Sequence, residues 1–441
     1  MLCRGRRAGV VGIMTEFSMP QFGFRADAES TAAPELGDGA AGAELPAAPD
    51  YDRGTLNMVV PTLDAALAEW HGVAPVCSGP GTGIDAAELI PGIEPARRAV
   101  MVMVDGLGSE LIERYGGHAP VIRQAMQGKN SQVLSTVFPT TTAAALTAMG
   151  TGLAPAEHGI VGYDAVAPDP AGGRRMVNQL GSWPSDLDPR EWQPNPTCFE
   201  RMEAVRRVVT VSRDKFEDSA LTRSSLRGGE FVGVTTPHAR VGATLTELKH
   251  KDVFVYLYWD DLDKAGHAHG VASKQWLHEL EELDAAMGRL IAKLPPDTAV
   301  VLTADHGMVD IPREGRIDYS QFPELIDGVE LTAGEPRAVQ LHFAADAPQS
   351  QHDAVVAAWK ERFGADAWIL TREEYVELGW FGAEFRDGVL ERAGDVVIAA
   401  HGPIALYDGR RVSPHAFEMI GQHGSLTEAE RRIPFAVLAQ A

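Results

Sequence analysis

The stretch AVMVMVDG, at Ala99–Gly106, joins six consecutive apolar residues to an aspartate and a glycine. An uninterrupted apolar run of this length is typical of a strand that is buried on both faces, as in a parallel sheet. The same arrangement recurs at Val253–Asp263 and at Thr298–Gly307, where an apolar run again ends in carboxylates. These three stretches predict the core strands of one parallel sheet.

Helical periodicity separates the second and third of these strands. Ser273 can cap a helix whose apolar positions step by three and four: Leu277, Leu280, Leu283, Met287, Leu290, Ile291 and Leu294. Weaker strands are expected at Arg207–Ser212 and Glu230–Val234. Strands that alternate with helices predict an α/β fold with a mostly parallel central sheet and helices on both faces.

Carboxylates and histidines follow the predicted strands or stand between glycines. The residues concerned are Asp105, Asp263, His267, Asp305, His306 and His423. A lone Asp-Gly is usually a turn, and a lone histidine in a glycine loop is usually a surface residue. Together, however, they are all ligand types for a divalent metal ion, and ligands bind beyond the carboxyl ends of such strands. The sequence therefore indicates a metal site at this edge.

A proline-containing turn delivers three threonines to an alanine-rich segment, STVFPTTTAAALTAM, at Ser135–Met149. Thr142 is expected in the first turn of a helix, where free N–H groups and the helix dipole favour an anion. A hydroxyl becomes a good nucleophile only when a base or a metal activates it. On these residues alone, Thr142 is either a helix cap or an activated nucleophile.

The order of these motifs resembles that of the alkaline phosphatase superfamily, and within it the type I phosphodiesterase/nucleotide pyrophosphatase family. The resemblance spans roughly residues 99–425. The motifs that carry it are VDG (104–106), FPTTT (138–142), TG (151–152), EHG (157–159), DKAGH (263–267), TADHGM (303–308) and QHG (422–424).

The resemblance implies a site for two zinc ions or other divalent cations. One ion would be bound by Asp263, His267 and His423. The other would be bound by Asp105, Asp305 and His306, with the oxygen of Thr142 completing the set. The nucleophile would be Thr142, with Thr141 as the fallback, and the intermediate a phospho-threonine. The implied substrate is a small molecule with a phosphodiester or pyrophosphate bond, such as a nucleotide.

The chain also departs from the family pattern. Ala145 stands where family pyrophosphatases commonly carry an asparagine that donates to a phosphate oxygen, and Ala143 stands where alkaline phosphatases place an arginine. A phosphomonoesterase or a phosphonate hydrolase on the same site therefore stays open, as does a non-catalytic metal-binding protein. The complete ligand set with its hydroxyl argues against the last. Sulfatases are disfavoured because no Cys-x-Pro-x-Arg or Ser-x-Pro-x-Arg motif occurs.

The acidic composition limits the classes of partner. The 441 residues carry a formal net charge of −22, which argues against binding nucleic acid through a basic surface. No apolar run reaches the roughly 18 to 20 residues that a membrane span needs. Without a clear signal peptide, a cytoplasmic protein is the default expectation. Residues 1–13 are interpreted as a leader that is not exported, or as sequence upstream of a start at Met14.

Composition also suggests how the chain divides. Residues 1–50 are expected to form a disordered arm, 51–309 the main domain, 310–400 a small inserted α+β lid, and 401–441 the return to the main domain. Four histidines away from the motifs are expected on the surface or in loops: His238, His342, His401 and His415.

Overall fold

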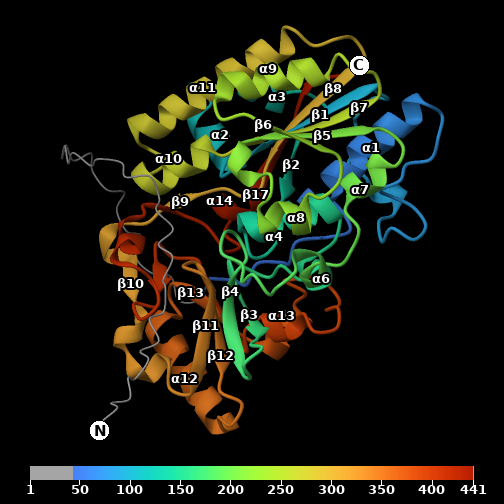
Figure 1. Cartoon of the computed structure of the whole chain (residues 1–441). Coiled ribbons are helices and arrows are strands. Elements are labelled where there is room, and N and C mark those ends of the chain that lie inside the picture. The colour runs from blue at the N-terminus through green and yellow to red at the C-terminus, as the bar shows by residue number, and fades with distance from the viewer. Residues whose placement is uncertain (1–42, 441) are drawn as a thin grey trace, which may run out of the picture. The chain divides into compact units, whose positions relative to one another are not determined.

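The computed structural model describes residues 43–440. The predicted leader, and the predicted arm up to residue 42, lie outside the described residues. Figure 1 shows a large sheet flanked by helices, with a second, smaller sheet below it.

Seven strands form the large sheet. Its order is β2-β17-β8-β1-β7-β5-β6. The bounds in that order are Gln132–Ser135, Arg432–Ala439, Thr298–Ala304, Arg98–Val104, Val253–Trp259, Arg207–Ser212 and Glu230–Gly233. Strand β17 runs antiparallel to both of its neighbours, and the pairs from β8 to β6 are parallel. The prediction of a mostly parallel sheet is confirmed.

The three central strands end level with one another. Val104 of β1 lies opposite Trp259 of β7 on one side and Ala304 of β8 on the other. Every residue of these strands is buried, as their apolar runs predicted. The residues that follow them, Asp105 among them, therefore emerge at one edge of the sheet.

Helices cover both faces of the sheet (Figure 1). On one face lie α2, α3, α9 and α11, at Ser109–Tyr115, Pro120–Met126, Pro237–Glu247 and Lys274–Ile291. On the other lie α1, α4, α7 and α8, at Val59–Trp70, Thr142–Thr151, Cys198–Glu203 and Ala220–Ser225. Ser273 caps α11 as predicted, because its hydroxyl accepts from the Trp276 N–H at 3.1 Å.

Short elements surround the carboxyl edge of the sheet. Helix α10, Asp261–His269, follows β7, and the short strands β9 (Val309–Asp310) and β16 (Gly421–Gln422) pair beside it. The hairpin β3–β4 spans Asp164–Pro168 and Arg174–Asn178. Three further short α-helices are α5, Pro155–His158, α6, Pro189–Trp192, and α14, Glu428–Arg431.

A small subdomain follows β9. Its antiparallel sheet has the order β11-β12-β14-β13, at Val329–Glu335, Ala338–Phe343, Val396–Ala400 and Ala367–Thr371. Helix α12, Gln349–Phe363, packs on this sheet around a separate core that includes Trp359. Helix α13 (Arg372–Glu377) and the parallel pair of β10 (Arg316–Asp318) and β15 (Ala405–Tyr407) complete it.

The structure also bears on the expected position of His342 and on the expected absence of a membrane span. His342, expected at the surface or in a loop, is fully buried in β12, so that expectation is wrong. Strand β12 lies between β11 and β14, and His342 is buried by tertiary packing that the local sequence does not reveal. Among the described residues, no helix is long and apolar enough to cross a membrane.

Candidate metal centre

Three aspartates converge at the carboxyl edge of the sheet. Asp105 follows β1, Asp305 follows β8, and Asp263 lies in the first turn of α10. In each, one carboxylate oxygen is buried and has no hydrogen-bond partner among the described residues: Asp105 Oδ1, Asp263 Oδ1 and Asp305 Oδ2. A buried acceptor without a partner is costly, so three in one place indicate the position of a cation.

The other oxygens of two of these aspartates are held firmly. Asp305 Oδ1 accepts from the N–H groups of Gly106 and His306, both at 3.0 Å, and Asp105 Oδ2 accepts from the hydroxyl of Tyr258. Burial raises the pKa of Asp105 well above its ordinary value, and the charges of Asp263 and Asp305 raise it further. A bound cation would reverse this penalty.

Three histidines face the aspartates in the same orientation. The Nδ1 atoms of His267, His306 and His423 lie 2.7, 2.9 and 2.7 Å from backbone carbonyl oxygens. Because a carbonyl can only accept, each Nδ1 carries a proton, so that the lone pair of the neutral form of each ring lies at Nε2. Metal-binding histidines are commonly fixed in this way.

The Nε2 atoms of His267 and His306 lie near the partnerless carboxylate oxygens. His267 Nε2 lies 3.3 Å from Asp263 Oδ1, and His306 Nε2 lies 3.5 Å from both Asp105 Oδ1 and Asp305 Oδ2. The rings of His306 and His423 stack with their centres 3.5 Å apart. Burial lowers the pKa of His423 well below its ordinary value, with the neighbouring His306 and His267 adding to the effect. A ring kept neutral in this way is available as a ligand.

Two groups of three residues could each hold a metal ion, because the ligand atoms within each group all lie within 4.8 Å of one another. The first, Asp105, Asp305 and His306, matches the set that the resemblance implied for one ion. The second is Asp263, His306 and His423. His306 therefore belongs to both groups. His267 belongs to neither, but it contacts Asp263, and its ring centre lies 5.3 Å from that of His423. All six expected ligands lie at one centre, and their division between two ions stays a prediction.

Thr142 begins α4 beside this centre, as the sequence predicted. Its Oγ1 lies 3.3 Å from His306 Nε2. Among the described residues, the N–H groups of Thr142 and Ala143 have no protein acceptor. The alanines of α4, Ala143 and Ala145 included, are fully buried, so neither of the two departures from the family pattern supplies a polar group. The backbone N–H groups at the start of α4 are therefore the groups that could bind an oxyanion.

Thr140 is a structural residue of the site that the sequence did not reveal. Its N–H donates to Gly424 O at 3.0 Å, and its hydroxyl donates to Ser425 O at 3.0 Å and accepts from the Gly424 N–H at 2.9 Å. Its carbonyl accepts from His423 Nδ1. Thr140 thus fixes the His423 loop against the threonine turn. No local pattern announces these contacts, which join segments more than 280 residues apart.

The family model described as Type I phosphodiesterase / nucleotide pyrophosphatase matches residues 99–426, and this range contains all of these residues. The chain belongs to this family. The resemblance stated from the motifs is thereby confirmed.

Two curated proteins show more distant likeness to this phosphodiesterase-family chain. The phosphopentomutase of Anaeromyxobacter dehalogenans is 33% identical over 141 residues, which cover 30% of this chain and 34% of that protein. The bis(5'-adenosyl)-triphosphatase ENPP4 of Bos taurus is 25% identical over 273 residues, which cover 54% of this chain and 55% of that protein. The chain thus matches about a third and about half of these relatives' own lengths.

Solved structures share the fold of this family member. Murine ectonucleotide pyrophosphatase/phosphodiesterase 5 aligns with a TM-score of 0.60 and 17% identity, over 76% of this chain and 87% of the other. Phosphonoacetate hydrolase from Sinorhizobium meliloti, in complex with phosphonoformate, aligns with a TM-score of 0.58 and 19% identity, over 79% and 91%. At such identities the likeness establishes the alkaline-phosphatase-like fold.

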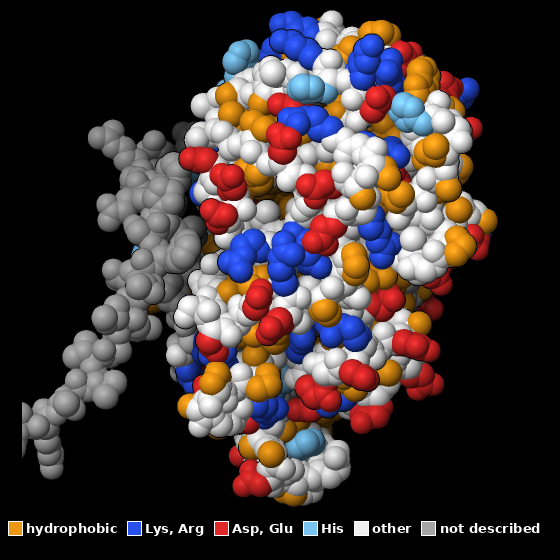
Figure 2. Space-filling model, turned by 45° about the vertical axis from the view of Figure 1, so that its right-hand side comes forward, with side chains coloured by type: hydrophobic (Ala, Val, Ile, Leu, Met, Phe, Trp, Pro, Cys, Tyr) orange, Lys and Arg blue, Asp and Glu red, His pale blue; other side chains and the backbone are white. Residues whose placement is uncertain are grey.

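Cationic side chains lie beside the centre of this phosphodiesterase-family chain. Lys264 follows Asp263 directly and forms an ion pair with Asp260. The Lys215 ammonium lies 4.7 Å from the centre of the Phe216 ring, which packs edge-on against Tyr258. Burial lowers the pKa of Lys215, and the charge of Lys264 lowers it further. Elsewhere acidic and basic side chains intermingle over the visible face (Figure 2).

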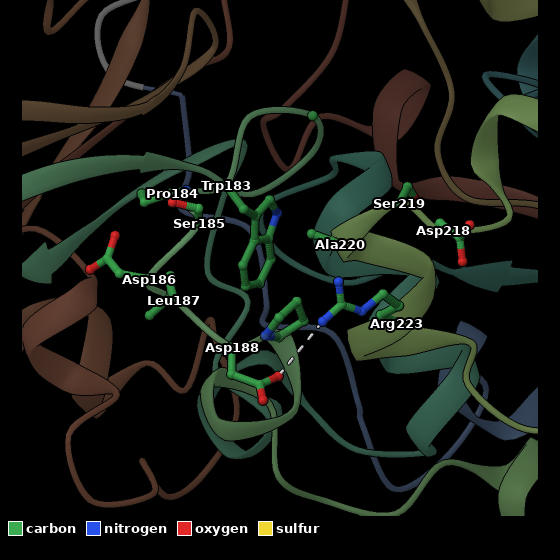
Figure 3. A pocket seen from close by; sticks show the side chains of 12 residues that line it. Trp183, Pro184, Ser185, Asp186, Leu187, Asp188, Asp218, Ser219, Ala220 and Arg223 are labelled. Atoms are coloured by element: carbon green, nitrogen blue, oxygen red, sulfur yellow. Dashed lines mark ion pairs between the residues drawn. The ribbon is translucent and has the colours of Figure 1, made fainter.

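A separate cavity of about 480 Å³ lies between the loop 181–189 and the start of α8 (Figure 3). Trp183 lines it together with Asp186, Asp188 and Asp218, and Arg223 forms an ion pair with Asp188 at 4.0 Å. None of the predicted site residues lines this cavity.

Proposed function

We propose that the chain is a zinc-dependent hydrolase of phosphodiester or pyrophosphate bonds that acts through a phospho-threonine at Thr142. One observation carries the proposal. Three carboxylate oxygens without hydrogen-bond partners and three histidines fixed through Nδ1 meet at one centre, next to a hydroxyl at the start of a helix. This combination supplies metal ligands, a nucleophile and oxyanion donors together.

The donor set fits zinc. Imidazole nitrogens combined with carboxylate oxygens suit zinc better than magnesium or calcium, which prefer oxygen ligands alone. The residues that would hold two ions are Asp105, Thr142, Asp263, His267, Asp305, His306 and His423. When bound, the two ions would lower the pKa of the Thr142 hydroxyl and offset the charge on the phosphoryl group.

The chain's own groups define the chemical steps. The Thr142 hydroxyl loses its proton to water, and its oxygen forms a bond to phosphorus as the bond to the leaving oxygen breaks and that oxygen takes up a proton from water. The free N–H groups of Thr142 and Ala143 bind phosphoryl oxygens at the positive end of the α4 dipole. Water then cleaves the phospho-threonine and restores the hydroxyl.

The substrate is a small phosphorylated molecule, and a nucleotide is the first candidate. Lys215 and Lys264 place positive charge beside the centre of an otherwise acidic chain. Among its relatives, one is named a bis(5'-adenosyl)-triphosphatase, and another was solved as an inactive threonine-to-alanine variant in complex with AMP. A phosphomonoesterase or phosphonate hydrolase is the alternative, and the latter accords with the phosphonoacetate hydrolase among the similar structures.

Parallel assays of nitrophenyl monoesters, nitrophenyl diesters and dinucleoside polyphosphates test the proposal. We expect zinc-loaded wild-type protein to hydrolyse diesters or pyrophosphates faster than monoesters, and Thr142→Ala to hydrolyse none while it keeps its zinc. Wild-type protein that binds zinc but turns over no phosphorus ester would support the non-catalytic alternative. The lid role of the subdomain and a cytoplasmic location stay predictions.

A further inference from the structure

Strand β7 holds both the backbone and the side chain of Asp105. The Asp105 N–H donates to Trp259 O at 2.9 Å, which extends the pairing of β1 with β7 by one residue. Asp105 Oδ2 accepts from the hydroxyl of Tyr258, the residue before Trp259. Asp105 Oδ1 is buried, has no hydrogen-bond partner among the described residues, and lies 3.5 Å from His306 Nε2. The two oxygens of this carboxylate therefore have different surroundings.

Asp305 shows the same division between its two oxygens. Its Oδ1 accepts from the N–H groups of Gly106 and His306. Its Oδ2 has no hydrogen-bond partner among the described residues and also lies 3.5 Å from His306 Nε2. In both aspartates, one oxygen is bound to the protein and the other is open toward the same histidine nitrogen. A carboxylate held in this way offers one oxygen to a cation in a fixed direction.

The Tyr258 ring is itself held in place. It is buried, and it stacks on Tyr256 with the ring centres 6.3 Å apart and the planes 16° apart. Phe216 packs edge-on against it with the ring centres 5.9 Å apart, and the Tyr258 carbonyl accepts from Arg240 Nη1 at 2.9 Å. Packing of this kind restricts the rotamer of a side chain. The hydroxyl therefore stays at one position beside the Asp105 carboxylate.

Tyr256 offers a comparison within the same strand. It lies two residues before Tyr258, on the same face of β7, because side chains alternate along a strand. Tyr256 is also buried, but its hydroxyl has no hydrogen-bond partner in the described part of the chain. Among the described residues, Tyr258 alone donates a side-chain hydroxyl to one of the three aspartate carboxylates of the centre. The two tyrosines thus share their packing and differ in this one hydrogen bond.

We propose that Tyr258 is a positioning residue of the metal centre, whose hydroxyl binds Asp105 Oδ2 so that Asp105 directs Oδ1 at the ion beside Thr142. This inference rests on the proposed function, which places zinc at this centre. A hydroxyl that donates to a carboxylate forms a charge-assisted hydrogen bond, about twice as strong as one between neutral groups. One such bond is enough to hold the short aspartate side chain in a single orientation.

Loss of this hydroxyl should weaken zinc binding. A carboxylate that is already oriented loses little side-chain freedom when an ion binds, whereas a free carboxylate must be ordered at the expense of affinity. The ion concerned lies beside the nucleophile, because Thr142 Oγ1 lies 3.3 Å from His306 Nε2, the atom that Asp105 Oδ1 faces. Its loss should therefore also lower kcat.

Two tyrosine-to-phenylalanine variants test the inference, since each removes one buried hydroxyl and keeps the ring with its packing. Competition with a chelator measures the affinity for each zinc ion. For Tyr258→Phe we expect the affinity for one of the two ions to fall about tenfold or more, the usual loss when the hydrogen-bond partner of a metal ligand is removed. The affinity for the other ion should not change. Tyr256→Phe is the matched control and should change neither affinity, because its hydroxyl has no acceptor.

Zinc concentration separates a misdirected ligand from a damaged site. At limiting zinc, the kcat of Tyr258→Phe should fall with the occupancy of the weakened site, and excess zinc should return it to the wild-type range. Circular dichroism of the metal-free proteins checks that both variants fold. A double variant gives a second route: if Tyr258 acts through Asp105, adding Tyr258→Phe to Asp105→Ala should weaken zinc binding no further.

Several outcomes would overturn the inference and leave the proposed function intact. They are wild-type zinc affinities in Tyr258→Phe, an equal loss in Tyr256→Phe, a fall in kcat that excess zinc does not reverse, and a double variant that binds zinc more weakly than Asp105→Ala. Wild-type protein that binds no zinc rejects both proposals. Selective loss of one ion in Tyr258→Phe supports the inference even if wild-type protein hydrolyses none of the tested esters, a result that would reject the proposed function alone.

Discussion

Arg337 and Glu430 form a fully buried ion pair between the small subdomain and α14. Arg337 Nε and Nη2 each lie 2.8 Å from a different oxygen of the Glu430 carboxylate. Glu430 Oε1 also accepts from the Ser425 N–H at 3.0 Å, and its carbonyl accepts from the Gly307 N–H at 2.8 Å. Through Glu430, the pair is therefore hydrogen-bonded to the segment that contains His306 and to the segment that contains His423.

Arg337→Met should destabilise the metal-free protein by about 3–5 kcal/mol, because it leaves the Glu430 carboxylate buried without its partner. It should also weaken zinc binding, since both histidine segments lose a fixed neighbour. Urea unfolding and zinc titration measure the two effects. Arg362→Met breaks an exposed pair with Glu324 and should cost less than about 1 kcal/mol. Equal costs for the two variants would contradict the role of the pair.

Purified protein should carry close to two zinc ions per chain, and His423→Ala should lower the occupancy of one site. The reason is that His423 presents a neutral ring with Nδ1 already bound to Thr140 O. Elemental analysis measures the zinc, and circular dichroism checks that the fold persists. His415→Ala, at an exposed position, should change neither. Only trace metal in wild-type protein, with no activity on adding zinc, would reject the metal centre.

Thr142→Ala should lower turnover about a thousandfold or more and leave the zinc content unchanged, because the other ligands remain. Thr142→Ser should keep measurable activity, since the hydroxyl survives and only the methyl group that restricts its rotamer is lost. Thr141→Ala should cost little. Rates and zinc content are measured on the same preparations. An essential Thr141 with a dispensable Thr142 would shift the nucleophile by one residue.

The stability of the metal-free protein should depend on pH through Glu335. Its pKa is raised in the folded state, chiefly by burial, so the folded chain holds the proton more tightly than the unfolded chain. The stabilising contribution is complete below the ordinary pKa of glutamate and is lost as pH rises through the folded pKa. The free energy of unfolding of the wild-type protein should therefore fall, relative to that of Glu335→Gln, as the pH rises above about 4. Urea unfolding across this range measures the difference, and a constant difference would contradict it.

The central strands and Thr142 were predictable because local patterns specify them. Unbroken apolar runs marked β1, β7 and β8, and proline followed by alanines marked the start of α4. The short, partly exposed strand β2 has no such run. Contacts between distant segments left no local signal at all: Glu335 and Tyr163 are 172 residues apart. Their roles depend on tertiary packing alone.

The level ends of β1, β7 and β8 make the metal centre sensitive to how these strands pair. A slip of one residue in any of them would move its following carboxylate by about 3.3 Å and turn alternate side chains to the opposite face. A chain with mispaired strands could not assemble the donor set. A cation that binds these donors therefore stabilises only chains whose strands pair in the native register. Its binding free energy thus favours the native sheet over mispaired forms.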